Sequence, residues 1–280
     1  MKGKLFIVST PIGNLEDITL RALRILKEVD LIACEDTRVT KKLLSHYQIH
    51  KPLTSYHEHN EREKAEELLS LLESGKSIVV VSDAGTPGVS DPGYRLVSLA
   101  SKKGIEVIPI PGPSAAIAAL SASGLPTSSF TFLGFLPKSA KKRKERLETV
   151  REYAEALIFY ESPNRVIETL KDMFKVLGDR QVSVSREITK MFEETLRDKI
   201  SNLINTLEQR ENIKGEFTIV LEGRSNEVNE LNDIIEKQLN IYKENALSLS
   251  DTVKEVSRNL GVSKSKIYKK ALEVWRKAQE

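Results

Sequence analysis

In the first half of the chain, short apolar runs alternate with amphipathic segments. The runs at 5–8, 31–34, 78–81 and 105–110 are short and mostly apolar, and the run at 78–81 consists entirely of β-branched residues, which is typical of buried strands. Between them, apolar residues recur at helical spacing, most clearly at 61–74, where Gly75 ends the predicted helix. Further helices are predicted at 18–27, with Asp17 as cap and Leu20 on its inner face, after 35–40, and at 94–100 and 114–122. Repeated strand, loop and helix predict a mostly parallel sheet.

The second half repeats this alternation and then loses its strands. Strands are predicted at 130–133, 156–160, 181–185 and 217–221, with helices near 141–153, 166–177 and 199–209. A polar stretch at 224–232 is typical of a linker. Helices at 251–259 and 263–277, joined by Gly261 and Val262, match a helix-turn-helix pattern. With a hinge at 124–127, we predict an α/β domain at 1–124, a second α/β domain at 125–224 and a helical appendage at 225–280.

Composition narrows the class of protein. The 280 residues are 40% hydrophobic and 30% charged, with a net charge of +3, so binding of nucleic acid would depend on local patches. Cys34 is the single cysteine and lies in an apolar run, which favours a buried structural thiol. The N-terminus lacks a signal-peptide pattern, and no apolar run approaches the ~20 residues of a membrane helix. We expect a soluble, cytoplasmic protein.

The stretch at 82–93, Ser-Asp-Ala-Gly-Thr-Pro-Gly-Val-Ser-Asp-Pro-Gly, is the leading candidate for ligand binding. It follows a predicted strand, as do the loops at 10–14 and 111–115, so all three should open at one edge of the sheet. The second domain would cover this edge and form an interdomain cleft. The alternative is a tight connection that needs Gly and Pro only for its turns.

Several familiar site patterns are absent from the sequence. The loop at 10–14 lacks the Gly-Lys-Ser/Thr ending of a Walker loop, and the loop at 82–93 is not Gly-x-Gly-x-x-Gly. His57-Glu58-His59 has no Cys or further His at metal-ligand spacing, which favours a polar loop over a metal site. We therefore expect no phosphate loop, no ordinary dinucleotide site and no metal.

Seven blocks, in order, resemble one branch of the tetrapyrrole methylase superfamily, the ribosomal RNA small-subunit methyltransferase I family. They are Ser-Thr-Pro-Ile-Gly-Asn-Leu-Glu-Asp-Ile-Thr at 9–19, Cys-Glu-Asp-Thr-Arg at 34–38, Ser-Tyr-His-Glu-His-Asn at 55–60, the loop at 82–93, Pro-Gly-Pro-Ser-Ala at 111–115, Tyr-Glu-Ser-Pro at 160–163 and Ser-Arg-Glu-Ile-Thr-Lys at 185–190. The resemblance spans about residues 4–223. One departure is Asn164, where the family usually has His.

The resemblance implies two α/β domains of the tetrapyrrole methylase type with S-adenosylmethionine held between them. It also implies 2′-O-methylation of one cytidine (cytidine 1402) of 16S ribosomal RNA, and a homodimer. Thr86 replaces the Asp usual in tetrapyrrole enzymes, which argues against a tetrapyrrole substrate. The cofactor-binding residues implied by the resemblance are Pro11, Ala84, Gly85, Thr86, Pro87, Val89, Ser114, Ala115 and Tyr160.

A ribose hydroxyl benefits from a general base and from a cation that stabilises the developing alkoxide. Glu35 and Asp36, at the end of a strand beside the expected cleft, are the candidates for the base. Lys190 is the candidate cation, and Arg38 is a candidate for holding phosphate. An ordinary surface ion pair is the alternative for each of them.

Two basic segments favour RNA as the substrate. One contains Lys141, Lys142, Arg143 and Lys144, and the other, in the last predicted helix, contains Lys266, Lys269 and Lys270. The helical appendage would dock on folded RNA by shape. Two alternatives remain: a tetrapyrrole-type small-molecule methylase of the same fold, and a non-catalytic RNA-binding factor for ribosome assembly.

Overall fold

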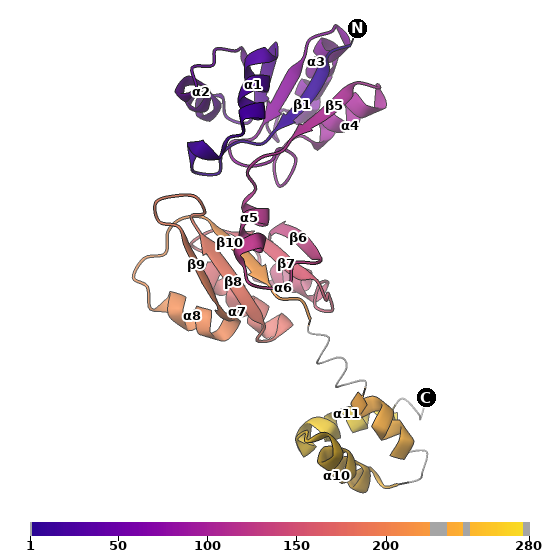
Figure 1. Cartoon of the computed structure of the whole chain (residues 1–280). Coiled ribbons are helices and arrows are strands. Elements are labelled where there is room, and N and C mark those ends of the chain that lie inside the picture. Colours follow the sequence, from indigo (N-terminus) through magenta and orange to yellow (C-terminus); the bar gives the residue numbers. More distant parts are fainter. Residues whose placement is uncertain (1, 225–233, 243–246, 277–280) are drawn as a thin grey trace. The chain divides into compact units, whose positions relative to one another are not determined.

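The computed structural model describes residues 2–224, 234–242 and 247–276, without the side chains of residues 273 and 276. Contacts between residues divide the chain into two compact units (Figure 1). The larger unit comprises Met1–Arg151 and Glu155–Glu222, and the smaller unit comprises Glu152–Ala154 and Gly223–Glu280. Both predicted α/β layers lie in the larger unit.

The first sheet is five-stranded and entirely parallel, as the alternating pattern predicted. Its order is β3-β2-β4-β1-β5, and its strands are β1 (Lys4–Val8), β2 (Leu31–Cys34), β3 (Leu53–Ser55), β4 (Ile78–Val81) and β5 (Glu106–Ile110). Its helices are α1 (Leu20–Glu28), α2 (Thr37–His46), α3 (Glu61–Glu73) and α4 (Tyr94–Lys102). Alternate residues of each strand face opposite sides. Val79 therefore packs in the cluster of α1 and α2, while Val80 packs in the cluster of α3 and α4.

The second sheet is mixed, with the order β6-β7-β10-β8-β9. Its strands are β6 (Phe130–Phe135), β7 (Ala156–Glu161), β8 (Gln181–Arg186), β9 (Glu194–Lys199) and β10 (Phe217–Leu221); β6 and β7 are parallel and the other pairs antiparallel. The helices α6 (Ala140–Glu148), α7 (Val166–Leu177) and α8 (Ile200–Glu208) contribute Leu147, Leu170 and Leu203 to one hydrophobic cluster with strand residues such as Phe159.

Helix α5 (Ala115–Ala122) packs against the opposite face of this second sheet. Ala116, Ala119 and Leu120 share a cluster with Ile158 and Val220. The chain therefore passes from one sheet to the other at 111–114, before α5, whereas the predicted hinge at 124–127 follows it. The division into three domains stays a prediction.

The smaller unit is helical. A helical stretch at 234–242, α10 (Leu249–Leu260) and α11 (Lys264–Arg276) share a small core that includes Leu239, Val256 and Ile267. Gly261 lies in the left-handed region, with φ +65°, and ends α10. The two helices predicted here are confirmed, while the predicted linker lies outside the described residues apart from Arg224. None of the described helices combines the length and the apolar content needed to cross a bilayer.

Some local predictions were wrong. Thr19, not Asp17, caps α1: its side chain accepts from the Ala22 backbone N–H, while Asp17 belongs to a short 3-10 helix. Leu20 is 86% exposed and not on the inner face. The edge strands β3, of three residues, and β9, of six residues, were missed. Cys34, by contrast, is buried in β2 as predicted.

Candidate active site

Three loops meet at the carboxyl edge of the first sheet, as predicted. Thr10 and Gly85 exchange two backbone hydrogen bonds of 2.9 and 3.0 Å. The Thr86 hydroxyl lies 2.9 Å from that of Ser9 and donates to the Pro113 carbonyl at 3.4 Å. These contacts fix the loops that follow β1, β4 and β5 to one another.

A cavity of about 420 Å³ opens above these loops and is lined from both sheets. Seven of the nine residues predicted to bind the cofactor line it: Ala84, Gly85, Thr86, Val89, Ser114, Ala115 and Tyr160. Pro11 instead lines an adjoining cavity of about 360 Å³, and Pro87 lines neither. The predicted loops and the cavity therefore coincide, and the role of each residue stays a proposal.

Several lining residues were not identified from the sequence. Phe135, at the end of β6, and Tyr160 form an aromatic wall with ring centroids 5.6 Å apart. Asp91, in the loop at 82–93, adds a carboxylate, whereas the buried carboxylate of Glu161, beside Tyr160, is bonded to Thr169 and Arg165. Asp91 and Glu161 lie in blocks that the sequence had already singled out, but Phe135 has no comparable local signal.

Helix α5 begins at the cavity without a side-chain cap. Ser114 is its N-cap residue but makes no side-chain capping bond, and both Ser114 and Ala115 line the cavity. An uncapped helix N-terminus presents backbone N–H groups and a partial positive charge, which suit a carboxylate.

Asp36 has a structural role that argues against its predicted role as base. Its carboxylate caps α2 by accepting from the Arg38 backbone N–H at 2.8 Å. It is also paired with the Arg38 guanidinium, 2.6 Å from Nη2 to Oδ2. These bonds lower the pKa of Asp36 to about 2, so the group is a poor proton acceptor near neutral pH. The same pair occupies Arg38, the predicted phosphate ligand.

Glu35 lies in a different electrostatic environment. Burial, followed by the charges of Asp83 and Asp91, raises its pKa. Burial likewise raises the pKa values of Asp83 and Asp91, which line the smaller and the larger cavity respectively. Glu35 itself lines neither cavity. Its connection to the candidate site is the electrostatic interaction with these two aspartates.

Replacement of Glu35 by Gln should raise Tm at pH 7–8 and change it little at pH 4. An acid whose pKa is raised by folding contributes stability below its ordinary pKa, and this contribution is lost as pH rises through the raised value. Thermal melts at both pH values measure the difference. Glu66→Gln, at an exposed position of α3, is the control for loss of one carboxylate at the surface. An equal change in Tm at both pH values would show that folding does not disfavour the charged form of Glu35.

Lys190 reaches the smaller cavity from the second sheet. Its Nζ lies 3.0 Å from Glu187 Oε1 and 2.8 Å from Glu216 Oε2. Burial alone would lower its pKa, but the bonds to Glu216 and Glu187 outweigh it and raise the pKa, so Lys190 stays charged. Its stem packs over Gly13, where a Cβ would collide with it. The predicted cation therefore lies beside the loop at 10–14.

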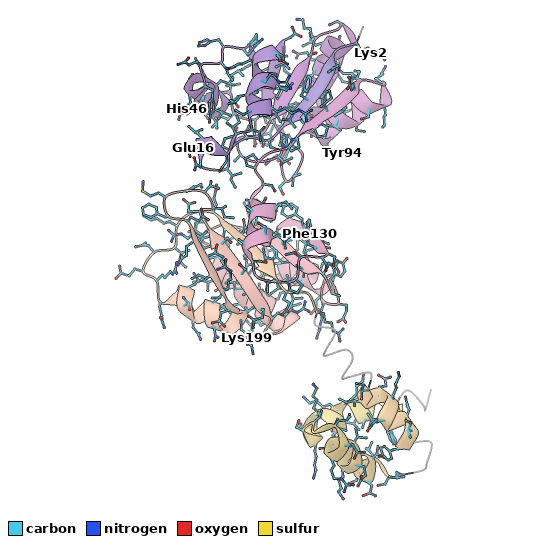
Figure 2. All side chains as sticks on the ribbon, in the orientation of Figure 1. Lys2, Glu16, His46, Tyr94, Phe130 and Lys199 are labelled. Carbon is cyan, nitrogen blue, oxygen red and sulfur yellow. The ribbon has the colours of Figure 1, made fainter. Side chains whose placement is uncertain are left out.

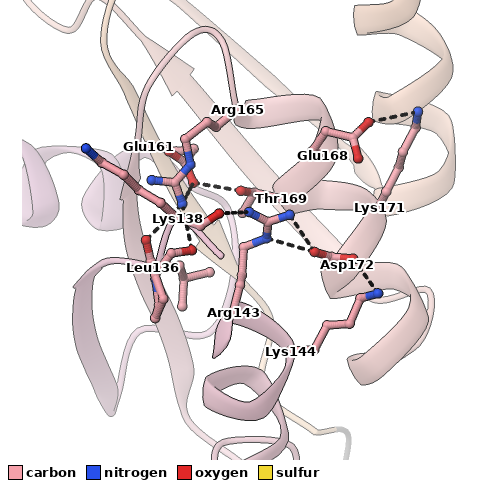
Figure 3. A network of polar contacts seen from close by, with 11 residues as sticks. Leu136, Lys138, Arg143, Lys144, Glu161, Arg165, Glu168, Thr169, Lys171 and Asp172 are labelled. Atoms are coloured by element: carbon pink, nitrogen blue, oxygen red, sulfur yellow. Dashed lines mark hydrogen bonds and ion pairs between the residues drawn. The ribbon is translucent and has the colours of Figure 1, made fainter. Parts of the chain in front are cut away.

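Arg143 is the clearest correction among the predicted RNA contacts (Figure 3). Its guanidinium is buried between α6 and α7 and binds Asp172, at 2.8 Å from Nε and 2.7 Å from Nη2. Lys144 approaches the same carboxylate at 3.5 Å. Arg143 is thus a structural residue, because its side chain is buried and its guanidinium is already bonded to Asp172, so it cannot bind phosphate.

The other predicted RNA contacts stay predictions. Lys141 and Lys142 are exposed on α6, and Lys266 and Lys269 are exposed on α11. Lys270 is paired with Glu236 at 3.1 Å. Among the described residues, no group of three or more His, Cys, Asp or Glu side chains is placed to hold a metal ion.

Comparison with known proteins gives a consistent family. Residues 4–204 match the model of the Tetrapyrrole (Corrin/Porphyrin) Methylases. The Ribosomal RNA small subunit methyltransferase I of Halalkalibacterium halodurans is 48% identical over 273 residues, 95% of this chain and 94% of the relative. That of Thermotoga maritima is 49% identical over 222 residues, 79% of this chain and 99% of the relative.

Solved structures share the fold at low identity. The methyltransferase CobJ has 19% identity and a TM-score of 0.59, covering 79% of this chain and 95% of its own. Uroporphyrin-III C-methyltransferase from Thermus thermophilus, complexed with S-adenosyl homocysteine, has 19% identity and a TM-score of 0.53, covering 78% and 97%. These likenesses support the two-sheet architecture.

Proposed function

Because the chain belongs to the ribosomal RNA small subunit methyltransferase I family of the tetrapyrrole methylases, we propose that it methylates 16S ribosomal RNA. The proposed reaction transfers a methyl group from S-adenosylmethionine to the 2′-hydroxyl of one cytidine, cytidine 1402. The 48% identity over 95% of the chain to a relative of that name is the observation that carries the proposal. The smaller cavity beside the larger one supports it, because a donor and an acceptor need adjoining sites.

The larger cavity fits the methyl donor. Its volume of about 420 Å³ lies within the range of small-molecule sites. Gly85 has φ +84° and no side chain, so a ligand can approach its Cα closely, while its backbone N–H and C=O stay bonded to Thr10. The uncapped start of α5 suits the carboxylate of the donor, and Asp91 suits its positive charges. When bound, S-adenosylmethionine supplies an electrophilic methyl group on a sulfonium.

The chain's own residues would orient the acceptor and accept its proton. Glu35 remains a proposed base because its raised pKa brings it closer to neutral pH. Asp91 is an additional proposal, since its pKa is also raised and it lines the larger cavity. Asp36 is the weaker candidate, as its carboxylate is committed to Arg38 and to the cap of α2.

Lys190→Met should lower kcat while leaving the Kd for S-adenosylmethionine unchanged. Lys190 lines the smaller cavity, where its charge would stabilise the developing alkoxide. Removing a preorganised donor typically lowers kcat by more than tenfold. Because Glu187 and Glu216 already offset part of the Lys190 charge, we expect kcat to fall by only about tenfold. Single-turnover rates and calorimetry separate the two quantities. A raised Kd with unchanged kcat would instead assign Lys190 to cofactor binding.

Transfer of labelled methyl to unmethylated small ribosomal subunits tests the proposed function. We expect label in the ribose of one cytidine, and none when that nucleotide is the 2′-deoxy form. Label in a base, or in a tetrapyrrole but not in RNA, would overturn the proposal. Absence of both transfer and binding of S-adenosylmethionine would favour the non-catalytic assembly factor.

The proposed partner is 16S ribosomal RNA within the small subunit, in the cytoplasm, with a homodimer as the working form. Sedimentation of the purified protein, alone and with subunits, measures both associations. A monomer with full activity would contradict the proposed dimer.

A further inference from the structure

The segment from α2 to the start of β3 carries positive charge without any acidic residue. Residues 37–52 contain Arg38, Lys41, Lys42 and Lys51, together with two histidines, and no Asp or Glu. The whole chain has a net charge of only +3. This segment therefore concentrates charge that the rest of the chain largely balances.

The fold arranges these residues around a groove. A cavity of about 750 Å³ lies between α2 and the start of β3, and we call it the α2 groove. Its lining comprises Thr37, Arg38, Lys41, Leu44, Ser45, Ile49, His50, Lys51, Pro52 and Leu53. Arg38, Lys41 and Ser45 follow one another at i, i+3 and i+7, so they lie on one side of the helix. His46, also on α2, is labelled in Figure 2 and exposed.

The floor of the groove is rigid because it belongs to the core. Leu44 and Ile49 are 3% and 4% exposed and share a hydrophobic cluster with the first sheet. Thr40, one helical turn from Leu44, is buried as well. The basic side chains are therefore presented by a packed helix and not by a loose loop.

Much of this charge is free. Arg38 is paired with Asp36, but Lys41, Lys42 and Lys51 make no ion pair with any residue that the structure describes. Arg143 and Lys144, in the basic segment that the sequence favoured, are both bound to Asp172. The lysines of α2 and its flank are thus better placed to bind an external anion.

We propose that the α2 groove binds the sugar-phosphate backbone of the ribosomal RNA next to the methylated nucleotide; this inference rests on the proposed function. Helix α2 has 10 residues and so extends about 15 Å, enough to follow several phosphates of one strand. Val39 and Lys42, on the adjacent side of α2, line the smaller cavity. A strand held in the groove would therefore continue directly into the candidate active site.

The double charge reversal Lys41→Glu with Lys51→Glu, in the full chain, tests the proposal. We expect affinity for 16S ribosomal RNA to fall by roughly tenfold or more, and the slope of log K against log salt to become shallower by about 1–2. The Kd for S-adenosylmethionine, measured by calorimetry, should be unchanged, which also shows that the variant is folded. The milder pair Lys41→Gln with Lys51→Gln should give an intermediate loss.

The matched control is Lys27→Glu with Lys102→Glu, which changes the net charge equally at exposed positions of α1 and α4. It should alter RNA affinity less than about twofold. An equal loss of RNA affinity in the control and in the groove variant would show that only the net charge of the protein matters, and would overturn the proposal. Lost affinity for assembled subunits but not for naked RNA would assign the groove to a ribosomal protein, and would also overturn it.

The outcomes for the proposed function are separable from those for the groove. RNA binding that depends on Lys41 and Lys51, without methyl transfer by the unaltered protein, would overturn the proposed reaction and support the groove. Methyl transfer with unchanged RNA affinity and salt slope in the groove variant would do the opposite. Failure of the unaltered protein to bind ribosomal RNA at low salt would overturn both.

Discussion

Gly85→Val is expected to weaken binding of S-adenosylmethionine by about a hundredfold or more, a loss of at least ~2.7 kcal/mol. Gly85 has φ +84°, where a β-branched residue is strained. An added Cβ would lie 3.6 Å from Ile12 Cγ2, and both residues line the larger cavity. The valine would therefore add bulk at the cavity wall and disturb the bonds between Gly85 and Thr10. RNA binding should remain nearly intact.

Gly104→Val is the matched control for Gly85→Val. Gly104 also has a positive φ, +64°, but no atom lies within 4 Å of its Cβ position, and it lines neither cavity of the candidate site. Backbone strain alone should lower Tm in both variants, whereas cofactor binding should be lost only in Gly85→Val. Calorimetry and thermal melts separate the two effects. Normal cofactor binding by Gly85→Val would remove the assigned role of this loop.

Asp172→Ala should lower the free energy of unfolding of the larger unit by about 3–5 kcal/mol, because it leaves the Arg143 charge buried without its partner. Both side chains are only 7% exposed, and two guanidinium nitrogens bind one carboxylate oxygen. In a unit of this size, the loss corresponds to a Tm lower by roughly 6–20 °C. Denaturant unfolding monitored by circular dichroism measures it.

Lys144→Ala is the control for the buried pair. Lys144 is half exposed and 3.5 Å from Asp172, so its removal should cost less than about 1 kcal/mol. The double change Arg143→Met with Asp172→Leu should recover most of the stability, since it removes both charges at similar volume. A stable Asp172→Ala variant with weakened RNA binding would show instead that Arg143 contacts the substrate.

The central strands of the first sheet, β2, β4 and β1, could be predicted because they are largely buried on both faces. Val79 and Val80 belong to different clusters, so burial demands a continuous apolar run that is visible in the sequence. The missed strand β9 has the opposite character. Its sequence, Glu-Thr-Leu-Arg-Asp-Lys, is polar because it lies at an exposed edge, where charges discourage pairing with other chains.

The candidate site was predictable where loops at one edge of the first sheet form it, and harder to predict where the second sheet contributes to it. Gly85 and Ser114 follow strands of one sheet, so strand order alone brings them together. Phe135 reaches the same cavity from another sheet, and only the packing of that sheet determines this position. Arg143 was predicted to contact RNA because it lies in a run of basic residues. The sequence alone does not show that Asp172, on the neighbouring helix, binds its guanidinium. The α2 groove was overlooked because apolar residues interrupt its lysines.

Strand β10 determines when the second sheet can form during synthesis. It is the last of the five strands in the sequence but the central one in space, pairing with β7 on one side and β8 on the other. The first sheet, in contrast, has all of its strands once residue 110 has been made. A nascent or truncated chain that ends before Phe217 therefore exposes the edges of β7 and β8 to other chains. We expect such fragments to aggregate more readily than the full chain, even though their first sheet is already complete.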